Sequence, residues 1–189
     1  MNGFVLAMGR SGTMWVAAAL AEAGSLDARH ESCESWERRD SWGEVEVNSF
    51  LWQNGADIRR EFPDVPIIHL VRDGRDVVRS VMNRKRPGRT LEDACRMWRN
   101  RNVHLRMTIP KRDRYRLEDL TTNYQRFVRL AERLKSPYVR RWVWDRMNDE
   151  RVNRNKVTEW PAFRDWSSKN RDIFWAQCGK EMRHYGYGS

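Results

Sequence analysis

The chain has 189 residues, with 36 lysines and arginines against 26 aspartates and glutamates, which gives a net charge of +10. This length favours one domain with a sizeable core, and the basic excess favours an anionic partner such as a nucleotide, a nucleic acid or an acidic substrate. Three widely spaced cysteines argue against a disulfide framework and a zinc site, and no apolar run approaches the roughly 18 residues of a membrane span.

Apolar runs of strand length alternate with segments that have the pattern of helices. The runs expected to form strands are residues 4–8, 26–29, 65–71 and 114–117. The segments expected to form helices are 14–23, 48–62, 90–107, 121–134, 138–150 and 167–184, with one more after Asp73-Gly74. This alternation predicts an α/β fold, a single three-layer domain over residues 1–189 in which helices flank a mostly parallel sheet.

The first strand is followed directly by Gly9-Arg10-Ser11-Gly12-Thr13 and then by the first helix. A glycine-containing loop at that point aims backbone N–H groups and the positive end of the helix dipole at one spot, which suits an anion. Arg10 adds a fixed charge, while Ser11 and Thr13 add hydroxyl donors. The structural alternative is a tight turn, but a turn needs neither the cation nor both hydroxyls.

A second polar cluster, RDGRDVVRS, follows the third expected strand. Arg72 ends that strand, Asp73 and Gly74 turn the chain, and Ser80 lies about two turns into the next helix. A guanidinium and a hydroxyl that converge from a strand end and the following helix form a phosphate clamp. Surface ion pairs between Arg72, Arg75 and the neighbouring aspartates explain the same segment equally well when it is taken alone.

Together, the two segments resemble the sulfotransferases that use 3′-phosphoadenosine 5′-phosphosulfate (PAPS). RSGTMW at residues 10–15 is similar to the family's Lys/Arg-Ser-Gly-Thr-Thr loop for the 5′-phosphosulfate, and RDGRDVVRS is similar to its motif for the 3′-phosphate. YRLEDL at residues 115–120 and the closing HYGY are further similarities. The resemblance covers roughly residues 3–120 and implies a P-loop-like sulfotransferase fold. It also implies that the protein binds PAPS and that sulfuryl transfer leaves adenosine 3′,5′-bisphosphate (PAP) as the product.

The resemblance implies roles for individual positions. Arg10 would contact the bridging oxygen of the phosphosulfate, Trp15 would stack on adenine, and Arg72 and Ser80 would bind the 3′-phosphate. The full set of residues implied to bind the cofactor is Gly9, Arg10, Ser11, Gly12, Thr13, Met14, Trp15, Arg72 and Ser80. No metal is implied.

The chain also departs from the family pattern. Met14 stands where a threonine is frequent, and Leu117 stands where the cytosolic branch has a tyrosine beside the nucleotide. The Arg-Lys-Gly element of that branch is absent near the C-terminus, and Arg154 or Lys156 is a candidate substitute.

An acceptor hydroxyl needs a general base. The candidates are His30, Glu31, Glu44 and Glu46. Glu31 matches the position of the catalytic glutamate in the tyrosylprotein branch, so it is the preferred base. Arg10, which would contact the leaving group, is also expected to be catalytic. His30 stays open as the alternative, because Glu31 could instead pair with one of many arginines. Cys33 is expected to be a bystander and His69 to be structural.

The sequence therefore predicts an enzyme that moves a sulfuryl group from PAPS to a hydroxyl or amine acceptor by in-line transfer. A P-loop phosphotransferase and a basic nucleic-acid-binding module are the alternatives. The loop lacks the Gly-Lys-Ser/Thr ending of a Walker A motif, and the chain has no recognised nucleic-acid motif.

The acceptor pocket is expected between residues 33–53 and 84–112. This region holds Trp36, Trp42, Trp52 and Trp98, which suit a flat phenol or a sugar, so the partner expected is a small-molecule or carbohydrate acceptor. Widely spaced cysteines and the absence of a signal peptide predict a cytoplasmic location.

Overall fold

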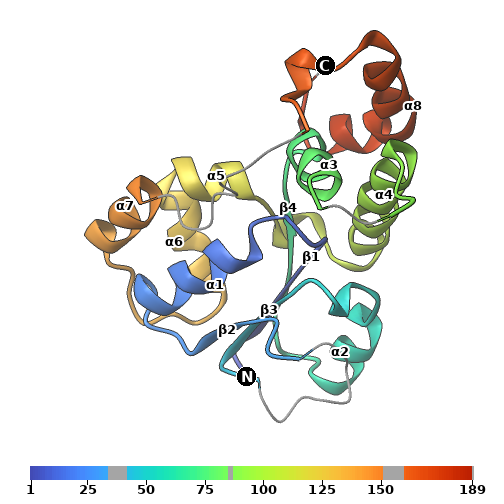
Figure 1. Ribbon diagram of the computed structural model, residues 1–189. Helices are drawn as coiled ribbons and strands as arrows, with labels where there is room; N and C mark the ends of the chain where they lie inside the picture. The colour runs from blue at the N-terminus through green and yellow to red at the C-terminus, as the bar shows by residue number, and fades with distance from the viewer. Residues whose placement is uncertain (34–41, 85–86, 151–159, 189) are drawn as a thin grey trace.

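The computed structural model describes residues 1–33, 42–84, 87–150 and 160–188. One five-stranded sheet runs through the molecule, and helices cover both of its faces (Figure 1). The strands are β1 (Gly3–Ala7), β2 (Ala28–His30), β3 (Val45–Asn48), β4 (Ile67–Val71) and β5 (Arg114–Arg116). The α-helices are α1 (Thr13–Glu22), α2 (Gly55–Glu61), α3 (Gly74–Met82), α4 (Leu91–Thr108), α5 (Leu117–Thr122), α6 (Tyr124–Arg133), α7 (Arg141–Asp149) and α8 (Ser168–His184). Short 3₁₀ turns are η2 (Leu51–Gln53), η3 (Lys111–Asp113) and η4 (Phe163–Asp165).

The strand order is β2-β3-β1-β4-β5, and every neighbouring pair is parallel. β1 is the central strand, where Val5 lies opposite Val47 of β3 and Ile68 of β4. The prediction of a three-layer α/β fold with a parallel sheet is confirmed. Because parallel neighbours need crossover connections, α1 separates β1 from β2, α2 separates β3 from β4, and α3 and α4 separate β4 from β5.

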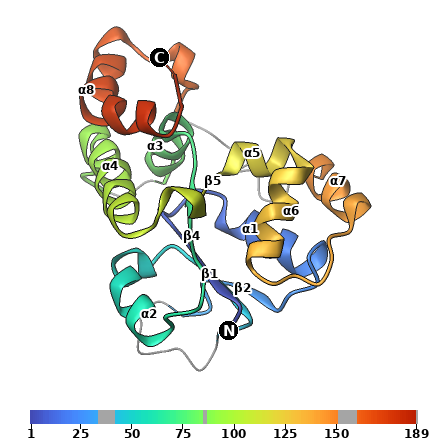
Figure 2. The same ribbon diagram turned by 180° about the vertical axis from the view of Figure 1, so that it is seen from behind.

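The two faces of β1 belong to different layers of the core. Val5 and Ala7 pack with α1, α6 and α7, whereas Phe4 and Leu6 pack with α2 and the end of α4. All four side chains are fully buried, which explains why β1 reads as a continuous apolar run. In both ribbon views, α1, α5, α6 and α7 lie on one side of the sheet, and α2, α3, α4 and α8 lie on the other (Figure 2).

The prediction of one helix over residues 48–62 is wrong. Asn48 is the last residue of β3, and α2 begins only at Gly55. The Asn48 side chain accepts hydrogen bonds from the N–H groups of Phe50 and Leu51 at 2.7 and 3.2 Å, so it ends the strand and starts the turn η2. The strand β3 was not predicted from the sequence, because the polar residues Glu46 and Asn48 interrupt the apolar run although both are fully buried.

Caps fix the other helix boundaries. Thr90 and Asp93 form the reciprocal capping box that starts α4. The helix expected over residues 121–134 is two helices, because the Asn123 side chain accepts a hydrogen bond from Arg126 N and starts α6. Residues 151–156, whose basic sequence predicts an exposed loop, lie outside the described residues.

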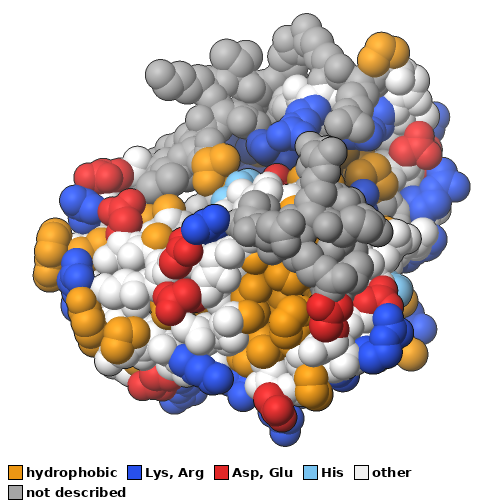
Figure 3. Space-filling model, turned by 90° about the horizontal axis from the view of Figure 1, so that it is seen from below, with side chains coloured by type: hydrophobic (Ala, Val, Ile, Leu, Met, Phe, Trp, Pro, Cys, Tyr) orange, Lys and Arg blue, Asp and Glu red, His pale blue; other side chains and the backbone are white. Residues whose placement is uncertain are grey.

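Charged side chains of both signs are spread over the surface. Seen from below, Lys and Arg side chains alternate with Asp and Glu around the rim, and hydrophobic side chains gather near the centre (Figure 3). Exposed pairs such as Arg141 with Asp145 contribute roughly 0–1 kcal/mol each, so the apolar layers supply most of the stability. None of the described helices combines the length and the apolarity needed to cross a membrane.

His69 is a core residue of β4, in line with the structural role expected for it. Its side chain is fully buried, and its Nε2 atom lies 3.0 Å from Asn102 Oδ1 on α4. The ring also meets the edge of the Tyr185 ring, with centroids 5.6 Å apart. Burial, which penalises the imidazolium, lowers the pKa of His69 to about 3.

This burial predicts a specific loss of stability in acid. Between pH 6.5 and about 3, the unfolded chain binds a proton at His69 that the folded chain does not, so stability falls as the pH falls through this window. The slope is about 1.4 kcal/mol per pH unit for one proton. Chemical denaturation from pH 7 to 4 should show a shallower loss for His69→Leu than for the wild type. Parallel curves for the two proteins would contradict this role.

Candidate functional site

A cavity of about 530 Å³ lies at the carboxyl edge of the sheet. The segments that follow all five strands contribute to its wall: Gly9 follows β1, Glu31 follows β2, Ser49 follows β3, Arg72 follows β4 and Leu117 follows β5. Ligands of parallel α/β sheets bind at this edge. The two polar clusters found in the sequence therefore meet at one cavity.

The loop between β1 and α1 has the geometry of an anion cradle. Arg10 and Gly12 both adopt left-handed conformations, with φ of 77° and 83°. A Cβ atom at Gly12 would also lie 2.5 Å from Leu117 Cδ2, so the Leu117 side chain would have to move. The hydrogen bond from Val16 N to Gly12 O is at 3.1 Å, so the N–H groups of the first helical turn before Val16 have no acceptor within the helix. The positive end of the helix dipole at this point favours an anion.

Arg10 joins the two clusters across the cavity. Its Nε atom donates a hydrogen bond to Ser80 Oγ at 2.7 Å, from a position 70 residues away in the chain. Arg72 donates from Nη1 to the carbonyl oxygen of Arg10 at 3.3 Å and from Nη2 to Asp76 at 3.0 Å. The ion pair between Arg72 and Asp76, which was the alternative to a phosphate clamp, is thus present. Arg72 also contacts the loop after β1.

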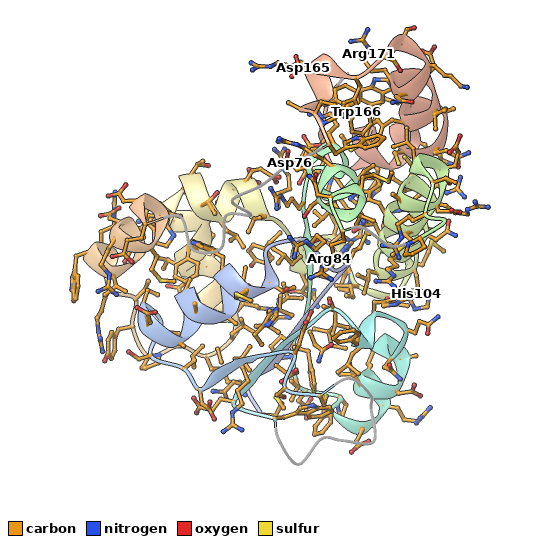
Figure 4. The ribbon with its side chains drawn as sticks, viewed as in Figure 1. Asp76, Arg84, His104, Asp165, Trp166 and Arg171 are labelled. Carbon is orange, nitrogen blue, oxygen red and sulfur yellow. The ribbon has the colours of Figure 1, made fainter. Side chains whose placement is uncertain are left out.

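Three guanidinium groups surround this part of the cavity. Burial and then the charges of Arg84 and Arg72 lower the pKa of Arg10, while Glu31 opposes them. Arg84 lies just beyond α3, where the loop after β1 approaches α3 and α4 (Figure 4). Because arginine stays protonated in proteins, this mutual repulsion remains until an anion enters.

The two candidate bases lie together in the cavity wall. His30 Nε2 is 2.9 Å from Thr13 Oγ1 and 3.7 Å from Glu31 Oε1. Ser49 Oγ donates a short hydrogen bond to the same carboxylate. Glu31 has a left-handed backbone with φ of 48°, and its N–H donates to Val47 O at 3.0 Å. Thr13, His30 and Glu31 therefore form a chain of contacts from the anion loop to a carboxylate.

The remaining loop residues lie at different depths. Met14 and Trp15 line the cavity, and Met14 is 43% exposed. The Trp15 ring is largely buried against Phe127, with ring centroids 5.9 Å apart. Ser11 is fully buried, and its Oγ atom has no hydrogen-bond partner among the described residues. Ser11 therefore belongs to the anion loop but is not one of the described residues that line the cavity.

Two other candidate bases lie away from the cavity wall. Glu44 accepts a hydrogen bond from Asp27 N at 2.9 Å, at the other end of β3. Glu46 is fully buried and accepts from Ser32 Oγ at 2.6 Å and from Asn48 Nδ2 at 2.8 Å. Both carboxylates are engaged in structural hydrogen bonds.

The tryptophans of the expected acceptor region have separate places. Trp42 Nε1 donates to Cys33 Sγ at 2.8 Å, and the Trp42 ring packs on Phe4. Trp98 is fully buried, and its Nε1 donates to the carbonyl oxygen of Arg72 at 3.2 Å, which fixes the end of β4. Trp36, Arg154 and Lys156 lie outside the described residues.

A hydrogen-bonded chain from the C-terminal segment fixes the turn after Arg72. Tyr187 OH donates to Glu118 Oε2 at 2.7 Å, and Glu118 Oε1 accepts from Asp73 N at 3.0 Å. The Asp73 side chain in turn caps α3 by accepting from Arg75 N at 2.8 Å. Arg116 lies 4.4 Å from the centre of the Tyr187 ring. YRLEDL and HYGY, which resembled family motifs, therefore meet behind the site.

Sequence reasoning did not single out several residues of the cavity wall. They are Ser49, Phe50, Arg84, Arg89, Met97 and Arg101, which it placed only within the ranges 33–53 and 84–112 expected for the acceptor pocket. Ser49 and Phe50 also lay inside the helix predicted over 48–62. The arginines fell in a stretch rich in arginine, and only their packing identifies the ones that line the cavity.

Within the described part of the chain, no three His, Cys, Asp or Glu side chains are grouped so that they could hold a metal ion. Protein-family models, curated proteins and solved structures give no significant match to this chain. The function is therefore inferred from the geometry and chemistry of the cavity.

The link between Tyr187 and Glu118 should contribute measurably to stability. Tyr187→Phe removes the donor to a carboxylate beneath the site, and a hydrogen bond to a charged group contributes about 1.5–3 kcal/mol. Urea denaturation should show a loss in this range. Tyr138→Phe is the matched control, because the Tyr138 hydroxyl also bonds to a charged group, Arg140 at 2.7 Å, but in a residue that is 51% exposed. It should change stability by less than about 0.5 kcal/mol. Equal losses in the two variants would show that the link has no such role.

Proposed function

We propose that this protein is a PAPS-dependent sulfotransferase that acts on a hydroxyl or amine acceptor. The observation that carries the proposal is the hydrogen bond between Arg10 and Ser80, at 2.7 Å. It joins the loop that resembles a phosphosulfate site to the helix that resembles a 3′-phosphate site. A nucleotide with phosphate groups at both its 5′ and 3′ positions needs two anion sites at such close range.

The residues of the cavity suit this cofactor. Arg10 and the N-terminus of α1 would hold the 5′-phosphosulfate, with the buried hydroxyl of Ser11 in the same loop. Arg72 in the cavity wall and Ser80 beside Arg10 would hold the 3′-phosphate, and Trp15, which lines the cavity, would lie beside adenine. Arg84 lies beside Arg10 and adds a third cation to the site. This cation would compensate for the Arg-Lys-Gly element of the resembled family, which the chain lacks.

Sulfuryl transfer makes two demands on the protein. PAPS supplies a sulfuryl group whose departure leaves negative charge on a phosphate, and a fixed cation must stabilise that charge. Arg10 is permanently protonated and lies at a helix N-terminus, so it meets this demand.

The second demand is removal of the acceptor's proton. We assign this role to Glu31, because its carboxylate lines the cavity on the side of β2 and β3. Ser49 and His30 both contact Oε1 of this carboxylate and fix its direction. His30 is already engaged with Thr13 at 2.9 Å, so we assign it to positioning.

The nucleotide specificity tests the proposal. The wild type should bind PAP more tightly than AMP in calorimetry, equally well with and without EDTA. Arg72→Ala should lower this preference about tenfold or more, because a charge-assisted contact contributes about 1.5–3 kcal/mol. Arg60→Ala, an exposed arginine on α2, is the matched control and should keep the preference.

Two results would contradict this reading of the cavity. One is tighter binding of ATP with magnesium than of PAP by the wild type, which would favour a phosphotransferase. The other is an unchanged preference for PAP in Arg72→Ala, which would make the guanidinium structural, paired only with Asp76.

The role of Glu31 has its own test. Glu31→Gln keeps the shape of the side chain but removes the base, which typically costs about 10²–10⁴ in rate. In a labelled-PAPS transfer assay, this variant should turn over at least about a hundredfold more slowly, with PAP affinity preserved.

Glu44→Gln is the control, because Glu44 lies at the opposite end of β3, and it should keep the wild-type rate. A near-normal rate in Glu31→Gln, together with loss of transfer and intact PAP binding in His30→Ala, would transfer the role of base to His30.

A further inference from the structure

We propose that the acceptor carries an anionic group beside the hydroxyl or amine that is sulfated, and that Arg101 and Arg89 bind this group. The inference rests on the proposed function and adds the chemical class of the acceptor. It follows from how the cations are divided between the two sides of the cavity.

One side of the cavity belongs to the nucleotide motifs. β1, β4 and β5 are adjacent in the sheet, and Arg10, Arg72 and Leu117 follow them. The other side is formed after β2 and β3, where Glu31, Ser49 and Phe50 lie. The carboxylate assigned as base is on this second side, so the acceptor must bind there.

Arg101 is held on the acceptor side. Its guanidinium carbon lies 5.3 Å from the centre of the Trp52 ring, and Trp52 is in η2, directly after β3 and Phe50. Trp52 is in turn fixed by the edge of His104, with ring centroids 5.3 Å apart and planes at 87°. A cation stacked on a fixed aromatic ring has a defined direction, which a binding residue needs.

Arg89 is the second cation of this side. Burial, followed by the charge of Arg89, lowers the pKa of Arg101. Arg10, in contrast, has Arg84 and Arg72 as its cationic neighbours. The arginines of the wall therefore form an inner group around the anion loop and an outer pair, Arg89 and Arg101.

The outer pair lacks a protein counter-charge among the described residues. Three other partly buried arginines have one: Arg72 pairs with Asp76 at 3.0 Å, Arg75 with Asp73 at 2.6 Å and Arg106 with Glu181 at 3.0 Å. Ion pairs of this kind are absent for Arg89 and Arg101 within the described ranges. Two like charges held together in a cavity wall favour an anion from outside.

The chemistry of the wall indicates the kind of anion. Guanidinium groups bind planar carboxylates and tetrahedral sulfates through paired N–H donors. Phe50 lines the same side and is 48% exposed, so it offers an apolar surface beside the cations. A phenol or a sugar that bears a carboxylate or sulfate combines these features with a hydroxyl that can face Glu31.

The test compares acceptors that differ only in charge. One pair is 4-hydroxyphenylacetate and its neutral amide, and the other is 4-nitrophenyl glucuronide and the corresponding glucoside. Binding of each to the full chain saturated with PAP is measured by calorimetry, and transfer from labelled PAPS is measured in parallel. We expect the acid to be preferred by about tenfold in at least one pair, since a charge-assisted contact contributes at least about 1.5 kcal/mol.

The variants assign the preference to its residues. Arg101→Gln and Arg89→Gln should each reduce the preference for the acid to about a third or less, and Arg101→Lys should restore part of it. Arg112→Gln is the control, because the Arg112 side chain is 79% exposed on η3, and it should keep the preference. PAP affinity, measured on every variant, reports that the nucleotide side is intact.

Each remaining outcome has one meaning. Equal binding of acid and neutral partner in both pairs by a wild type that binds PAP overturns the inference and leaves the proposed function standing. A full preference in both glutamine variants overturns the assignment to Arg89 and Arg101. Failure of the wild type to bind PAP removes the proposed function and the inference with it.

Discussion

The common direction of the five strands is the constraint on which the rest of this structure depends. Parallel strands all end at the same edge of the sheet, so each loop that leaves this edge can add a side chain to the same cavity. The order of the strands then divides the chemistry. Central β1 delivers the anion loop, β4 delivers Arg72 on one side, and β2 delivers Glu31 on the other. In the proposed function, position in the sheet thereby separates the nucleotide from the acceptor.

The cavity concentrates positive charge in a way that costs stability when it is empty. Arg10, Arg72 and Arg84 repel one another, and so do Arg89 and Arg101. The fold offsets this cost with the hydrogen bonds behind the site, in which Trp98 and Glu118 hold the backbone on either side of the Arg72–Asp73 peptide bond. Repulsion between like charges is typical of sites that bind an anion, because the same charges that lower the stability of the fold provide the binding energy.

The sequence was most informative where one type of residue serves one purpose. β1 is a continuous apolar run and β4 is apolar except for His69, because both faces of each strand are buried. The glycines, cation and hydroxyls after β1 indicate an anion loop. β3 was missed because the buried Glu46 and Asn48 look like surface residues in the sequence. Their hydrogen-bond partners, such as Ser32 and Cys33, are distant in the chain and become visible only in the folded structure.

The acceptor side was predictable only in part. Glu31 could be found from its distance to the loop, since the chain must return to the sheet within a few residues of α1. Arg101 could not be found from the sequence, because the role proposed for it depends on the Trp52 ring, which lies almost 50 residues earlier. Helix α4 carries many arginines, and the local pattern does not distinguish the one that faces the cavity from those that face solvent.

The span of the contacts in the site has a consequence for how the protein is made. Arg10 bonds to Ser80 across 70 residues, Glu118 to Tyr187 across 69, and Asn102 to Tyr185 across 83. Contacts this distant in sequence form late, because the loops between them must close first. During synthesis, the support beneath the site cannot be completed until residue 187 has left the ribosome. A nucleotide that binds only the finished cavity would then select fully folded chains by mass action, and so act as the last step of folding.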